Sequence, residues 1–139
     1  MNEFRYEDIS IGQIEEFEFN ITKEKMKQFL SITGDTNPLH NDICYAMEKG
    51  YADVVVYGLL TTSALSTLAG VYLPGKYSLI HSVEISYAKP VFVASSPLTV
   101  RGEVIAKDDR FSQITVKVSI FDKQHTKVCR GTMKIGVTN

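Results

Sequence analysis

The stretch from Val54 to Gly75, VVVYGLLTTSALSTLAGVYLPG, constrains the fold more than any other part of the chain, because it carries no charged residue over 22 positions. A helix of that length could span a bilayer. The stretch is interrupted, however, by internal glycines, by five hydroxyl residues and by Pro74. These interruptions favour a buried core helix from about Gly58 to Gly70, preceded by a short strand, over a membrane span.

The sequence around this helix has the pattern of a sheet. After Pro74 the apolar residues recur with a period of two, which is typical of strands with one buried face. Four strand-like segments follow the proline and one precedes the helix, at residues 77–93, 97–108, 111–122, 127–137 and 13–20. We therefore predict an α+β fold, in which an antiparallel sheet wraps around the apolar helix, as a single domain over residues 1–139.

Two shorter helices are expected between the first strand and the apolar helix. Thr22 has the position of an N-cap for the first of them, and Gly34 is placed to end it. Asn41 or Asp42 can cap the second, which runs through Glu48.

Composition excludes several classes of function. The 15 basic and 16 acidic residues of the 139-residue chain give a net charge of −1 without long runs of either sign, so no nucleic-acid surface or basic membrane anchor is indicated. No group of residues has metal-ligand spacing, so we expect no metal. Cys44 and Cys129 are expected to be buried free thiols, and the acidic N-terminus is no signal peptide, so we expect a cytoplasmic protein.

The segment SITGDTNPLHND, residues 31–42, gathers polar groups where a helix must end. Pro38 cannot continue the preceding helix, so the segment forms a loop. Asp35 and His40 lie five residues apart in it, where a carboxylate and an imidazole could act together in proton transfer. Asp and Asn are also ordinary turn residues, so the residue types by themselves leave a purely structural loop open.

The longer pattern TGDTNPLHNDICYA resembles the hydratase-2 signature of the MaoC-like dehydratases, a family that includes the (R)-specific enoyl-CoA hydratases. The segments YGLLTTSALSTLAG, YLPGK and ISYAKPVFV resemble three further family segments in the same order. The resemblance covers nearly the whole chain. It implies the hot-dog fold, a long antiparallel sheet wrapped around a central helix.

The resemblance also implies site residues. Asp35 and His40 correspond to the catalytic pair that activates water, and the Gly58 N–H corresponds to the oxyanion donor. Asn37 is implied to hold the loop or the substrate, and Ser66 to steady the loop from the helix. Each of the last three has an ordinary alternative: Gly58 as a glycine that starts a helix, Asn37 as a turn residue, and Ser66 bonded within its own helix.

Three positions depart from the family pattern. Tyr57 stands where the family usually has a histidine before the glycine, and Tyr87 stands where a phenylalanine is common. Residues 91–96, VFVASS, replace the usual Gly-Asp after the Pro-Val strand. Tyr57 could donate a hydrogen bond to the substrate, narrow the pocket or only pack. We expect altered acyl specificity and not a loss of activity.

The resemblance implies reversible hydration of a trans-2-enoyl thioester to a 3-hydroxyacyl thioester, with the (R) isomer expected and with coenzyme A or acyl carrier protein as the carrier. It implies a homodimer or a higher homo-oligomer, and no cofactor. Two other functions remain open at this point. One is a hot-dog thioesterase, and the other is a non-catalytic subunit that binds acyl thioesters or a partner protein.

Overall fold

Five antiparallel strands form one sheet in the computed structural model, which describes residues 1–139. The order across the sheet is β1-β3-β4-β5-β2, so β1 and β2 are its edges. The strands are β1 (Ile14–Phe19), β2 (Ser78–Tyr87), β3 (Leu98–Asp108), β4 (Gln113–Phe121) and β5 (Lys127–Val137). The four strands expected after Pro74 are confirmed, although β2 ends at Tyr87 and does not reach residue 93.

The core face of the sheet follows from the period-two pattern. Every second residue is buried from Leu98 to Val104 in β3 and from Ile114 to Ile120 in β4. The register pairs Val100 with Ile120 and Val104 with Val116. Opposite residues in an antiparallel pair share one face, so these side chains form a continuous apolar layer. Gly102 lies in this layer, where an added Cβ would come within 3.0 Å of the Leu68 side chain. The glycine therefore allows the central helix to approach the sheet closely.

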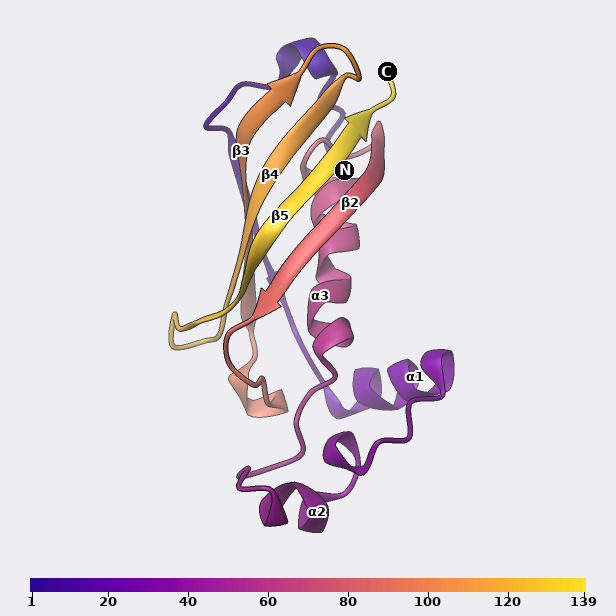
Figure 1. The fold of residues 1–139 in the computed structure, drawn as a ribbon, viewed down its shortest axis with the longest axis vertical. Coiled ribbons are helices and arrows are strands. Elements are labelled where there is room, and N and C mark those ends of the chain that lie inside the picture. The colour runs from indigo at the N-terminus through magenta and orange to yellow at the C-terminus, as the bar shows by residue number, and fades with distance from the viewer.

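The apolar stretch forms the central helix as expected. Helix α3 (Gly58–Thr67) continues into a π-helical turn, η3 (Leu68–Tyr72), and both lie along the core face of the sheet (Figure 1). Ala64, Leu65 and Leu68 are at most 3 % exposed, which accounts for the absence of charge on this helix. The expected hot-dog arrangement, a sheet around a central helix, is confirmed. No helix of the structure is long and apolar enough to cross a membrane.

The remaining helices gather at one end of the sheet (Figure 1). They are α1 (Lys23–Thr33), the 3-10 turn η2 (Pro38–His40) and α2 (Ile43–Glu48); two more 3-10 turns are η1 (Tyr6–Asp8) and η4 (Val93–Ser95). The caps are confirmed: the Thr22 side chain accepts a hydrogen bond from the Lys25 N–H, and Asp42 accepts one from the Tyr45 N–H. Gly34 ends α1 with φ of 70°, a conformation that favours glycine.

Two expectations are wrong. The segment directly before α3, residues 54–57, is extended but is not a strand. It bonds to two different segments: the Val55 N–H donates to Leu39 O, and the Val56 N–H donates to Val91 O. Single bonds of this kind do not make a ladder. Cys44 is exposed and not buried, whereas Cys129 is buried and its burial raises the thiol pKa to about 11.

Candidate active site

The loop between α1 and α2 is shaped by its own side chains. The Asn37 side chain accepts a hydrogen bond from the Leu39 N–H at 3.0 Å and so caps η2, which begins at Pro38. Asp35 Oδ1 accepts from the Asn37 N–H at 3.1 Å. Asn37 is exposed and its side-chain oxygen serves the loop. Its observed contact is therefore that of a turn residue.

His40 is oriented by the extended segment before α3. Its Nδ1 lies 2.6 Å from the Val55 carbonyl oxygen, and the neighbouring backbone pairs Val55 N–H with Leu39 O at 3.0 Å. A carbonyl only accepts hydrogen bonds, so Nδ1 carries the proton in this contact. In the neutral ring, Nε2 is then left with a lone pair, so this is the nitrogen that can take up a proton.

The beginning of α3 provides an unoccupied backbone donor. Gly58 is the first residue of the helix, so its N–H has no carbonyl one turn earlier in the helix to bond, and it makes no other hydrogen bond within the chain. Free N–H groups at a helix start favour an anionic oxygen. An added Cβ on Gly58 would lie 3.1 Å from the Tyr87 ring, so the glycine also keeps this approach open.

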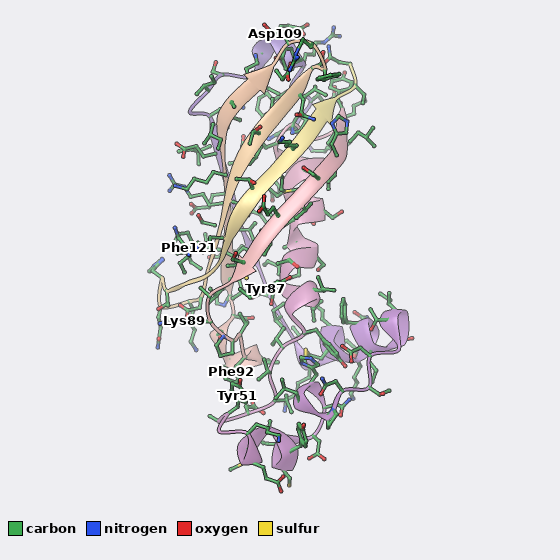
Figure 2. All side chains as sticks on the ribbon, viewed as in Figure 1. Tyr51, Tyr87, Lys89, Phe92, Asp109 and Phe121 are labelled. Carbon is green, nitrogen blue, oxygen red and sulfur yellow. The ribbon has the colours of Figure 1, made fainter.

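These residues meet at one cavity. A hollow of about 210 Å³ is lined by Asp35, His40, Tyr57 and Gly58, together with Phe29, Leu59 and Tyr87. The structure therefore brings Asp35 and His40 of the loop together with Tyr57 and Gly58 at the start of α3. Tyr87 and Lys89 lie at the end of β2 that faces the helical end of the molecule (Figure 2).

Two further hollows share lining residues with this cavity, and His40 lines both. One, of about 400 Å³, lies against α1 and is mostly apolar; its lining includes Met26, Leu30, Val54 and Tyr57. The other, of about 180 Å³, has Gly58 and Lys89 in its lining. His40 therefore lines all three hollows.

Ser66 is not brought to this site within one chain. It lies two turns along α3 from Gly58, its side chain is exposed, and it lines none of the three hollows. The role implied for it by the resemblance stays a prediction.

Sequence reasoning missed two contributors. The Val55 carbonyl fixes the His40 ring, and Thr62 Oγ1 lies 2.8 Å from the Tyr87 hydroxyl while donating to Gly58 O at 3.2 Å. The Thr62 contact could have been predicted, because a threonine four residues after Gly58 on one helix can donate to the Gly58 carbonyl. The backbone carbonyl has no sequence signal.

Thr61 supplies a stability prediction. Its Oγ1 is buried without a hydrogen-bond partner, so Thr61→Val removes an unsatisfied polar group. We expect the free energy of unfolding in urea to stay the same or to rise by up to about 1 kcal/mol. The adjacent Thr62→Val is the matched control and is expected to lose about 1 kcal/mol, because it removes two observed hydrogen bonds. If Thr61→Val lowered the free energy of unfolding as much as Thr62→Val, the Thr61 hydroxyl would have a hydrogen-bond partner.

The family follows from a comparison with known domains. The model of the MaoC-like domain matches residues 10–126, most of the chain. The chain belongs to the MaoC-like domain family. The match includes Asp35, His40 and Gly58, and thus the whole cavity described above.

The named relatives of this MaoC-like domain are hydro-lyases. It is 29% identical over 114 residues to the (R)-specific enoyl-CoA hydratase of Aeromonas caviae, covering 81% of this chain and 84% of that protein. It is 29% identical over 86 residues, 62% of this chain, to the 3-hydroxybutyryl-CoA dehydratase of Methylorubrum extorquens, of which it spans only 55%. The solved (R)-hydratase from A. caviae superposes with a TM-score of 0.86 at 27% identity, over 93% of this chain and 97% of that one.

Proposed function

We propose that this MaoC-like domain catalyses the reversible hydration of trans-2-enoyl thioesters to 3-hydroxyacyl thioesters, with the (R) product. The observation that carries the proposal is the single cavity lined by Asp35, His40 and Gly58. A proton-transfer pair and a free backbone N–H in one hollow are the groups this reaction needs. The relatives named as enoyl-CoA hydratases support the substrate class.

In the proposed reaction, a water molecule lies between Asp35 and His40, above the double bond. Its oxygen adds to Cβ while one member of the pair takes a water proton; the other supplies a proton to Cα. The electron pair of the double bond moves toward the thioester carbonyl, whose oxygen becomes enolate-like. The Gly58 N–H donates to that oxygen and lowers the barrier. Dehydration is the reverse, and neither direction requires a cofactor.

The apolar hollow against α1 gives the acyl chain a place to bind. It holds about 400 Å³, it adjoins the cavity through His40 and Tyr57, and Lys23 and Lys27 are among its lining residues. Its volume is in the range of small-molecule sites. We propose that the acyl chain lies there and that the carrier, coenzyme A or acyl carrier protein, stays outside.

The proposal is tested with purified protein and crotonyl-CoA, longer enoyl-CoA thioesters and the matching acyl-carrier-protein thioesters. We expect loss of the conjugated-enoyl absorbance, with a product that an (R)-specific but not an (S)-specific 3-hydroxyacyl-CoA dehydrogenase oxidises. Release of a free thiol would instead show a thioesterase. Absence of turnover with every carrier and chain length would contradict the proposal and favour a non-catalytic binding subunit.

We further propose a homodimer that forms through β2. Ile80 and Val83 lie opposite Ile135 and Met133 of β5 and therefore share the core face, yet they are 39% and 48% exposed. The rest of the chain leaves these two side chains uncovered, and β2 is a free sheet edge. An apolar edge strand is a template for pairing with a second chain.

A cytoplasmic location of the protein stays a prediction.

Val83→Lys tests the dimer. A charge in the middle of the apolar edge is costly to bury, so light scattering is expected to give the 15.6 kDa mass of one chain for the variant and twice that mass for the wild type. Ile105→Lys is the matched control, since Ile105 is 43% exposed on the outer face of β3. A wild-type monomer, or a dimer unchanged by Val83→Lys, would contradict the interface.

A further inference from the structure

Tyr57 contacts both members of the catalytic pair although it lies outside their loop. It is 2 % exposed and immediately precedes Gly58. Its hydroxyl donates a hydrogen bond of 3.0 Å to the backbone carbonyl of Asp35, and its ring centroid lies 4.2 Å from that of His40. A single side chain therefore connects Asp35, His40 and the residue that carries the oxyanion donor.

For Asp35, the bond from Tyr57 is the one connection to a distant part of the chain. Its other two hydrogen bonds are local: the Asp35 N–H donates to Thr33 Oγ1 at 3.2 Å, and Asp35 Oδ1 accepts from the Asn37 N–H at 3.1 Å. The loop is exposed around Asp35 and buries little apolar surface there. Without the phenol, local turn bonds alone would set the direction of the carboxylate.

For His40, the Tyr57 ring supplies a packing contact in addition to the hydrogen bond made by Nδ1. The hydrogen bond from Nδ1 to Val55 O fixes one edge of the imidazole. The tilted Tyr57 ring packs against the imidazole ring with an interplanar angle of 31°. The Tyr57 ring is itself in contact with Phe29 at 4.9 Å between centroids. Packed aromatic rings restrict one another's orientation.

The Tyr57 hydroxyl is well suited to remain a donor. Burial, and secondly the negative charge of the nearby Asp35, raise the pKa of Tyr57 above its ordinary value. The neutral phenol therefore persists throughout the pH range in which a histidine titrates.

We propose that Tyr57 is a positioning residue, whose hydroxyl holds Asp35 and whose ring holds His40 at fixed places relative to Gly58. The inference rests on the proposed function for its kinetic consequence. It assigns Tyr57 a role through other residues, and not a bond to the substrate. The phenol thus ties the loop to the start of α3, where the histidine usual in the family would present a different, smaller ring.

Two variants separate the two contacts. Tyr57→Phe keeps the ring and removes the hydroxyl, so we expect kcat to fall about tenfold with KM within about twofold, because a positioning loss affects the chemical step. Tyr57→Leu removes the ring as well and is expected to lower kcat further. In NMR spectra, the Asp35 amide is expected to exchange faster with solvent in both variants, and the His40 ring signals are expected to shift and broaden in Tyr57→Leu.

Tyr72→Phe is the matched control. Tyr72 is a half-buried tyrosine stacked on Phe17 at 4.5 Å between centroids, away from the cavity, so its variant should behave as the wild type. The proposal is overturned if Tyr57→Phe keeps the wild-type kcat and amide exchange, or if it raises KM alone, which would indicate a substrate contact. Absence of turnover in the wild type would contradict the proposed function; amide exchange and the His40 signals would then still decide whether Tyr57 positions the loop.

Discussion

Asp35→Asn and His40→Ala are each expected to lower kcat/KM for enoyl-thioester hydration by about a hundredfold or more, because each removes one of the two groups that transfer protons. Asn at position 35 can still accept the hydrogen bond from the Asn37 N–H, so the loop should keep its shape while losing the carboxylate. His40→Ala removes the imidazole and with it the hydrogen bond to Val55 O. Steady-state kinetics with crotonyl-CoA measures both.

The two controls for this pair line none of the three hollows. Asp109→Asn changes a carboxylate at the opposite end of the sheet (Figure 2), where Asn can still accept the hydrogen bond from the Tyr6 hydroxyl. His125→Asn changes a turn residue with φ of 62°, a conformation that Asn tolerates. Both controls should retain wild-type activity. Wild-type rates in Asp35→Asn or His40→Ala would show that the chemistry does not use the pair.

Gly58→Ala is expected to lower kcat/KM about a hundredfold while the protein stays folded. The added methyl would lie 3.1 Å from the Tyr87 ring, closer than ordinary contact, so the ring or the start of α3 must shift. Tyr87 is 48% exposed and can move, which limits the loss of stability. A shift of the helix start displaces the N–H that receives the thioester carbonyl, and a shift of the Tyr87 ring changes the wall of the same cavity. Either change misplaces the reacting groups, which is costly.

Gly70→Ala is the matched control on the same helical segment. A Cβ there would meet only Ser78 Oγ, at an ordinary 3.9 Å, and η3 is helical, so the variant should be active and as stable as the wild type. Thermal unfolding followed by circular dichroism separates loss of fold from loss of activity. A Gly58→Ala enzyme with wild-type kinetics would remove Gly58 from the oxyanion role.

Local signals predicted much of the fold. Thr22, Gly34 and Asp42 act as caps because each needs only its immediate neighbours, and these are visible in the sequence. The alternating strands were predictable for the same reason. The run of valines at 54–56 predicted a strand, because β-branched residues favour extended backbone, but the partners of Val55 and Val56 lie on two different segments and no ladder forms.

The site was predictable only in part. Asp35, His40 and Gly58 were found through the family pattern, and the structure brings them to one cavity. The bond from His40 Nδ1 to Val55 O and the bond from the Tyr57 hydroxyl to Asp35 O were not found. Both end on backbone carbonyls 15 and 22 residues away in the chain, and every residue has such a carbonyl, so the sequence gives no sign of which one is used.

The position of oxygen from solvent water tests the central claim most directly. Wild-type protein is incubated with an enoyl thioester in H₂¹⁸O and the products are analysed by mass spectrometry. Hydration at the Asp35–His40 site predicts an intact thioester with the label in the hydroxyl group on C3, and loss of this product in Asp35→Asn. Label in a free carboxylic acid, or an unlabelled enoyl thioester recovered in full, would contradict the account.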